Sequence, residues 1–173
     1  MSVIAQAGAK GRQLHKFGGS SLADVKCYLR VAGIMADYSQ PDDMMVVSAA
    51  GSTTNQLISW LKLSQTDRLS AHQVQQALRR YQSELISGLL PPEVADGLIG
   101  AFIHDLERLA GLLDSGVNDA VYAEVVGHGE VWSARLMSAV LNQQGLESAW
   151  LDARDFLRAE RGAQPQVDEG LSY

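Results

Sequence analysis

The 173-residue chain has a single cysteine, few positive charges and no long apolar run. Cys27 alone cannot form an internal disulfide, which fits a reducing, cytoplasmic setting. Lys and Arg number 14 against 20 Asp and Glu, a net charge of −6, whereas a nucleic-acid surface needs clustered positive charge. No apolar run approaches the roughly 18 residues of a membrane helix, and the N-terminus has no signal-peptide core. We therefore expect a soluble, cytoplasmic protein that binds neither nucleic acid nor membranes.

The sequence also lacks the motifs of the best-known metal and nucleotide sites. The four histidines share no metal spacing, HExxH and CxxC do not occur, and we predict no protein-held metal. The P-loop pattern GxxxxGK[ST] is absent, and GHGEVW at residues 127–132 has no third glycine to complete a dinucleotide fingerprint. If the chain binds phosphate, neither of these two cradles explains it.

What remains is an ordinary globular composition, 46% hydrophobic and 20% charged, enough for one domain or one large lobe of a bigger one. We expect a flexible tail over residues 1–12, and little pattern after residue 160. Short apolar runs predict strands at residues 13–17, 44–49 and 146–151. Helical spacing predicts helices over residues 21–38, 56–63, 70–90, 92–114 and 118–144, then a turn or short helix over 152–158. The opening order of strand, helix and strand is typical of a right-handed parallel unit.

Three details of these helices can be tested directly. Ser21 and Asp24 match a capping box, so the first helix is expected to begin at Ser21. Its apolar spacing includes Leu29 among the core positions, and Cys27 is expected to be a small core residue. The glycines at 127 and 129 are expected to loosen the middle of the last long helix.

The segment HKFGGSS, residues 15–21, lies where the first predicted strand gives way to a helix. Helix starts carry unpaired N–H groups and a partial positive charge, so anions bind there. Gly18 and Gly19 let the backbone approach a ligand, and Lys16 adds a full positive charge. The segment therefore indicates a phosphate cradle; the alternative is a simple Gly-Gly turn beside a surface lysine.

A second candidate segment is VVSAAGSTTN, residues 46–55, in which a buried strand ends at Ser48 and a hydroxyl-rich loop precedes a helix. Ligands of parallel sheets lie beyond the carboxyl ends of the strands, so we expect this loop and HKFGGSS to converge on one crevice. The alternative is that the hydroxyls at residues 52–54 only cap the next helix.

The third candidate is Glu130, within GHGEVWSARL. Its neighbours are small or apolar, although a single glutamate in a helix is usually a solvated residue. His128 is expected to line the same site because Glu130 is close to it in the sequence.

Taken in order, these segments resemble the aspartate kinase family, over about residues 13 to 160. The matching motifs are K-F-G-G-[ST]-S at 16–21, S-A at 48–49, T-N at 54–55, a helical G-E-x-x-S at 129–133, and D-x-R at 152–154. KFGG followed by SA and TN is far more specific than any single glycine pattern.

The resemblance implies an α/β fold of the amino-acid-kinase type, a three-layer α/β/α sandwich around a mainly parallel sheet. The implied reaction converts ATP and L-aspartate, with Mg²⁺, into 4-phospho-L-aspartate and ADP, the first step toward methionine, threonine and lysine. Residues 13–173 would form only the N-terminal, substrate-side lobe, incomplete at the C-terminus and inactive alone. NAD(P) is expected only if a homoserine dehydrogenase domain follows, and the protein is expected to be a homo-oligomer.

The resemblance also assigns roles to individual residues. The phosphate-contacting group falls on Lys16, Gly18, Gly19 and Ser20, with Lys16 as the catalytic residue, and the aspartate-binding group falls on Ser48, Thr54 and Glu130. These residue types suit the chemistry, because phosphoryl transfer needs positioning and neutralisation of negative charge. Hydroxyls can donate to the substrate carboxylates, and a glutamate is the natural partner of its ammonium.

Two alternatives stay open at this point. One is a kinase of another small carboxylate or carbamate on the same fold, although the TN and Glu130 matches favour aspartate. The other is a non-catalytic helical interaction module, since about half the chain is predicted to be amphipathic helix. That module would show a large exposed apolar face on the helices of residues 70–114.

Overall fold

A short parallel pair of strands begins the fold. In the computed structural model, which describes residues 11–158, 167, 170 and 172, β1 (Leu14–Phe17) pairs in parallel with β2 (Met44–Val47). Helix α1 (Val25–Tyr38) connects them, so the predicted strand–helix–strand unit is confirmed. Both β1 and β2 leave one face exposed, where Leu14 is 67%, Met44 58% and Val46 45% accessible.

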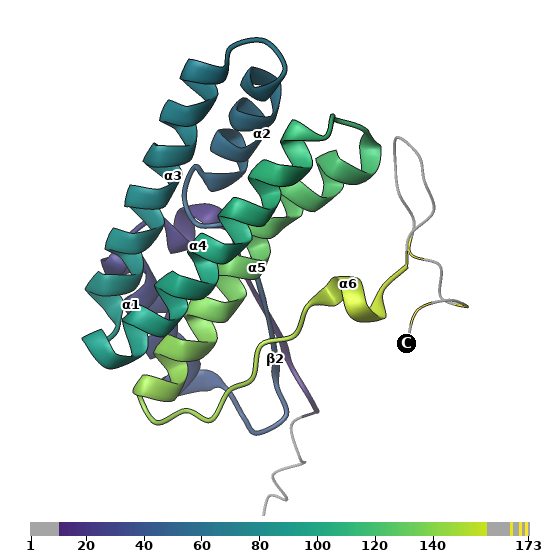
Figure 1. Ribbon diagram of the computed structural model, residues 1–173. Coiled ribbons are helices and arrows are strands. Elements are labelled where there is room, and N and C mark those ends of the chain that lie inside the picture. Colours follow the sequence, from purple (N-terminus) through teal and green to yellow (C-terminus); the bar gives the residue numbers. More distant parts are fainter. Residues whose placement is uncertain (1–10, 159–166, 168–169, 171, 173) are drawn as a thin grey trace, which may run out of the picture.

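Four long helices follow and make up most of the molecule (Figure 1). They are α2 (Thr53–Ser64), α3 (Arg68–Leu89), α4 (Pro92–Asp114) and α5 (Asp119–Gln143), and a single turn of helix, α6 (Ala153–Phe156), comes later. Pro92 lies in the first turn of α4, where its missing N–H costs nothing, so the predicted break between the two amphipathic helices is confirmed. One hydrophobic core joins α1 to α5.

The start of α1 differs from the prediction. Residues Gly19–Leu22 form a single 3₁₀ turn, η1, and α1 begins only at Val25, with the Asp24 carboxylate accepting a 2.8 Å hydrogen bond from the N–H of Cys27. Leu22 therefore lies outside α1 and does not define its buried face. Leu29 is exposed and Cys27 is only half-buried, so both core predictions were wrong. The buried positions are Tyr28, Val31, Ala32 and Met35.

Two further predictions also fail. Helix α5 runs unbroken through Gly127 and Gly129, because packing against the rest of the fold holds it. Residues 146–151 pair with no strand in the described part of the chain. Instead, the Asn142 side chain accepts a bond from the Ser148 N–H at 2.9 Å and donates one to the Ser148 carbonyl at 2.8 Å. These two bonds satisfy backbone groups that a neighbouring strand would otherwise pair with. Residues 1–10 of the tail predicted over 1–12, and most of the segment after 158, lie outside the described residues.

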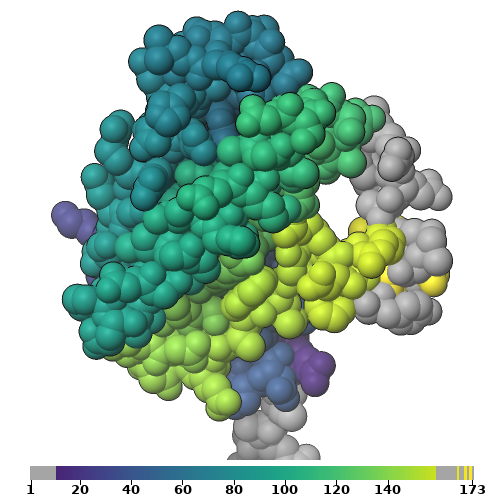
Figure 2. Space-filling model, viewed as in Figure 1, coloured from purple at the N-terminus to yellow at the C-terminus, as the bar shows by residue number. Residues whose placement is uncertain are grey.

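The surface of the two amphipathic helices is largely polar. Among the large apolar side chains of α3 and α4 in the structure, only Leu69 and Val94 are exposed. Helices α3 and α4, with the segment after α5, form much of the face seen in Figure 2. The broad apolar face that a helical interaction module requires is therefore missing from α3 and α4. Across the described residues, each helix is too short or too polar to cross a lipid bilayer.

Candidate active site

The first candidate loop, residues 18–24, leaves the end of β1 and begins with the two glycines of the KFGG motif. Lys16 is exposed, and a Cβ built on Gly18 would lie 3.6 Å from Lys16 Nζ, so the ammonium group lies over the backbone at Gly18. The loop enters the 3₁₀ turn, held by a 2.9 Å bond from the Ser21 N–H to the Gly18 carbonyl. Ser20 is exposed beside it. At the start of α1, the N–H of Cys27 is already bonded to the Asp24 carboxylate.

The second candidate loop, residues 48–52, leaves the end of β2. The Ser48 N–H continues the strand pairing with a 3.1 Å bond to the Phe17 carbonyl. The loop turns at Gly51, whose φ of +52° favours glycine. Ser52 occupies the N-cap of α2 but makes no capping bond through its side chain, whereas the Thr53 hydroxyl donates to the Ala50 carbonyl at 2.7 Å. Thus Ser52, one of the three hydroxyl residues that the alternative assigned to capping, does not cap α2 through its side chain.

The two loops are in direct contact. The Gly51 N–H donates a 3.1 Å hydrogen bond to the Gly19 carbonyl. A Cβ at Gly19 would lie only 2.7 Å from the Ala49 carbonyl oxygen, so the second glycine of the motif is needed for this approach. The predicted meeting of the two strand ends is therefore confirmed.

Helix α5 brings the third segment to the same place. A Cβ on Gly129 would lie 2.7 Å from the Ala49 Cβ and 3.3 Å from the Thr53 Cγ2, so a glycine lets α5 lie against the second loop. The next residue of α5, Glu130, reaches the same loop, and its Oε1 accepts a 3.2 Å bond from the Ala49 N–H. Glu130 is still exposed, so its carboxylate is accessible to a ligand.

His128 does not join this site, and that prediction was wrong. Residues two apart in a helix project to different sides, so Glu130 and His128 do not share a face. His128 is only 1% exposed, with Nδ1 2.6 Å from the Glu124 carbonyl oxygen and Nε2 2.8 Å from Nη2 of Arg108. A guanidinium can only donate, so Nε2 accepts and the proton resides on Nδ1. Burial lowers the pKa of His128 and keeps it neutral.

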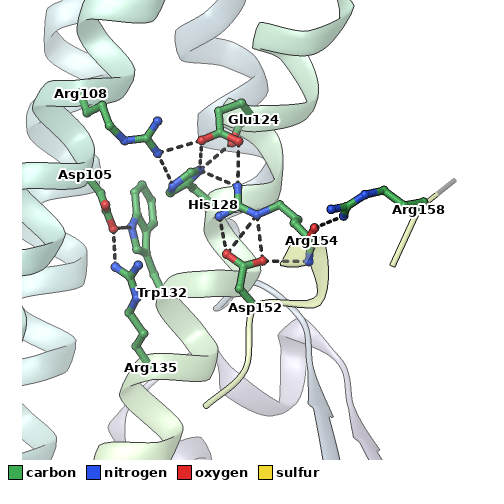
Figure 3. A network of polar contacts seen from close by, with 9 residues as sticks. All are labelled: Asp105, Arg108, Glu124, His128, Trp132, Arg135, Asp152, Arg154 and Arg158. Atoms are coloured by element: carbon green, nitrogen blue, oxygen red, sulfur yellow. Dashed lines mark hydrogen bonds and ion pairs between the residues drawn. The ribbon is translucent and has the colours of Figure 1, made fainter. Parts of the chain in front are cut away.

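The D-x-R motif takes part in a separate polar network (Figure 3). Arg154 lies 2.6 Å from Asp152 and 2.9 Å from Glu124, which also pairs with Arg108 at 2.8 Å. Hydrogen bonding from Arg154 lowers the pKa of the Asp152 carboxyl. The network attaches the segment after α5 to α4 and α5. Asp105 of α4, bonded to Trp132 and Arg135 of α5, makes a second link between the two helices.

Helix α3 contributes two residues that sequence reasoning missed. The Tyr81 hydroxyl donates a 3.0 Å bond to the Ala23 carbonyl, and the Gln82 amide donates a 3.0 Å bond to the Thr53 hydroxyl. Gln82 occupies the i+4 position between the buried Leu78 and Leu85, and this polar residue on an apolar face was the available signal.

The arrangement combines groups of opposite charge around one loop–loop contact. Lys16 and the glycine backbone of the first loop suit a phosphate, while the hydroxyls of Ser48 and Thr54 and the Glu130 carboxylate suit a small zwitterion. Thr54 is half-exposed in the first turn of α2, and Ser48 is half-exposed at the end of β2. Within the described residues, no group of three or more His, Cys, Asp or Glu side chains could hold a metal ion.

Comparison with known proteins shows several relatives. The chain is 90% identical over all 173 residues to the bifunctional aspartokinase/homoserine dehydrogenase 2 of Escherichia coli K12, covering 21% of that protein. It is 26% identical over 160 residues to a chloroplastic bifunctional aspartokinase/homoserine dehydrogenase of Arabidopsis thaliana, covering 90% of this chain and 18% of that protein. The chain thus spans about a fifth of the length of these relatives.

The fold has a solved counterpart. A crystal structure of E. coli aspartokinase III in complex with aspartate and ADP superposes with a TM-score of 0.79 at 25% identity, over 91% of this chain and 35% of that one. The expected fold type is confirmed as a helix-rich part of the amino-acid-kinase fold with a small parallel sheet. The profile described as "Amino acid kinase family" matches residues 11–171, and the chain belongs to that family.

Proposed function

We propose that this chain is the substrate-side part of an aspartate kinase, which transfers the γ-phosphoryl group of ATP to the side-chain carboxylate of L-aspartate. The observation that carries the proposal is the meeting of three distant segments at Ala49. Its carbonyl lies against Gly19, its Cβ against Gly129, and its N–H donates to Glu130. The names of the relatives, and the aspartate and ADP bound in the aspartokinase III crystal structure, support the same activity.

The first loop is proposed to bind the transferring phosphate. Phosphoryl transfer spreads negative charge over the phosphoryl oxygens, and preorganised donors stabilise that charge. Lys16 would supply a full positive charge, and the backbone N–H groups at Gly18, Gly19 and Ser20 would supply further donors. The position of the Lys16 ammonium over Gly18 supports this role, since one anion could contact both the ammonium and the backbone of Gly18.

The second loop and Glu130 are proposed to bind L-aspartate. The substrate carries two carboxylates and one ammonium, so its site needs donors for the former and an acceptor for the latter. Ser48 and Thr54 are the proposed donors, and Glu130 is the proposed partner of the ammonium. The bond from the Ala49 N–H supports this role, because it holds the exposed carboxylate of Glu130 beside the loop.

The remaining parts of the enzyme are also proposals. Mg²⁺ would arrive with the nucleotide, because its phosphates and water supply most of the ligands of this ion. The chain spans 21% of its 90% identical relative, so the rest of the nucleotide site would come from outside these 173 residues, which alone would show no turnover. We also propose a cytoplasmic homo-oligomer, and an NAD(P)-dependent homoserine dehydrogenase activity as in the name of the 90% identical relative.

The test is an assay of the complete polypeptide with ATP, Mg²⁺ and L-aspartate. ADP should form only when aspartate is present, and hydroxylamine should trap the acyl phosphate as a hydroxamate. Succinate, which lacks the ammonium, should be a poor acceptor. A preference for another small carboxylate or a carbamate would favour the alternative kinase, and no ADP with any acceptor would contradict a kinase altogether.

A further inference from the structure

Helix α3 carries none of the motif residues, yet its Tyr81 touches both candidate loops at once. The Tyr81 hydroxyl donates to the carbonyl of Ala23, in the first loop, at 3.0 Å. In the second loop, a Cβ on Gly51 would lie 2.8 Å from the same hydroxyl oxygen and 3.5 Å from the Ala23 Cα. Tyr81 therefore lies at the junction of the two loops, close to the bond from the Gly51 N–H to the Gly19 carbonyl.

The next residue, Gln82, contacts the second loop from the buried side, through Thr53. It is 3% exposed, and its Nε2 donates a 3.0 Å bond to the Thr53 hydroxyl, which in turn donates to the Ala50 carbonyl at 2.7 Å. A buried amide is costly unless it is hydrogen-bonded, so this bond favours one placement of the first turn of α2. That turn includes Thr54, the proposed aspartate donor.

We propose that Tyr81 and Gln82 are positioning residues of the kinase site. Tyr81 holds the first loop against the second, and Gln82 holds the second loop and the first turn of α2. The inference rests on the proposed function, in which the first loop binds phosphate and the second binds aspartate.

The two residues should affect different kinetic constants. Each substrate would still meet its own loop if Tyr81 lost its hydroxyl, but the reacting groups would be misaligned, and misplacement of about 1 Å can cost about 10²-fold in rate. Tyr81 therefore acts mainly on kcat. Gln82 shapes only the aspartate side, so its loss acts mainly on the KM for aspartate.

The experiment compares Tyr81→Phe and Gln82→Met in the complete polypeptide with two controls on exposed positions, Tyr38→Phe and Gln73→Met. Tyr81→Phe should lower kcat by about 10-fold and leave both KM values within about twofold. Gln82→Met should raise the KM for aspartate about fivefold with little effect on the KM for ATP. The controls should behave as the unaltered protein does.

A double-mutant cycle guards against a purely structural effect. In Gly51→Ala the new methyl would meet the Tyr81 hydroxyl, so this change should harm kcat less when Tyr81 is already Phe. The strain of a non-glycine residue at positive φ is the same in both backgrounds and cancels. Additive effects on kcat, or an unchanged kcat in Tyr81→Phe, would overturn the role of Tyr81; an unchanged KM for aspartate in Gln82→Met would overturn that of Gln82.

A second measurement separates this inference from the proposed function. If the unaltered protein forms no aspartate-dependent ADP, the proposed function fails, and hydrogen exchange at the Gly51 amide decides the positioning role. This amide bonds to the Gly19 carbonyl, so its exchange reports the contact between the loops. Faster exchange in Tyr81→Phe than in Tyr38→Phe supports the inference, and equal exchange rejects it.

Discussion

The backbone N–H of Ala49 donates a hydrogen bond to Glu130 Oε1 at 3.2 Å, across 81 residues of sequence. The bond connects the loop after β2 to the middle of α5. It also makes Glu130 a structural acceptor as well as a proposed ligand group, and the two roles can be separated by mutation.

Glu130→Gln should act mainly on aspartate. The amide keeps an oxygen that can accept from Ala49, but it loses the charge proposed to pair with the substrate ammonium. Hydrogen bonds to charged groups contribute about 1.5–3 kcal/mol, so the KM for aspartate should rise roughly 10- to 150-fold in steady-state kinetics. The KM for ATP should stay within a few-fold.

Glu130→Ala and Glu84→Gln complete this comparison. The alanine variant should also destabilise the second loop, because Ala49 loses its acceptor. Glu84 is exposed on α3, so its change should be silent. Normal aspartate affinity in Glu130→Gln, together with a lower melting temperature, would mean that Glu130 is only structural.

Lys16→Ala should lower kcat by a factor of at least ~10² in the complete polypeptide, because one preorganised donor is typically worth ~3–4 kcal/mol in the transition state. The KM for aspartate should change far less, since Lys16 lies over the first loop at Gly18. Lys62→Ala, on the exposed side of α2, is the matched control. A near-normal kcat would leave Lys16 as a surface lysine beside a turn.

Gly129→Ala should reduce stability although alanine favours helices. Its methyl would lie 2.7 Å from the Ala49 Cβ, and such overpacking typically costs ~1–3 kcal/mol. Gly100→Ala in α4 is the control, since nothing lies within 4 Å of its Cβ and the change should stabilise by ~0.5–1 kcal/mol. Urea unfolding measures both, and equal gains in stability would show that α5 and the loop are not in close contact.

Protonation of His128 should destabilise the fold at mildly acidic pH. Burial lowers its pKa in the folded state; the charge of Arg154 acts in the same direction, while the Glu124 backbone, and then the charges of Glu124 and Asp105, oppose the shift. The guanidinium of Arg108, which donates an N–H to Nε2, would also face the added proton. Since the unfolded state binds the proton more readily, with a pKa near 6.5, the stabilisation is present above that value and is lost as the pH falls below it.

Urea unfolding at pH 7.5 and pH 5.5 tests this sign. The wild type should lose more stability between the two pH values than His128→Gln, which cannot titrate. Equal losses in the two proteins would mean that His128 has the same pKa in the folded and unfolded states.

Much of the local architecture could be predicted from the sequence. Apolar runs and turn residues located β1 and β2, and the double proline located the break between α3 and α4. The parallel order of the strands, in turn, predicted that the two loops meet. These features depend on backbone preferences and periodicity over a few residues, which the sequence expresses directly.

Tertiary structure alone decided the rest. The buried setting of His128 is one example, since Arg108 of α4 packs over it. Tyr81 and Gln82 carry no motif, and their bonds to the loops exist only because α3 packs beside them. The sequence by itself determined which segments are proposed to carry the site chemistry and that two strand ends converge. Which side chains hold those segments together was decided by packing between residues far apart in the chain, and no local preference encodes such contacts.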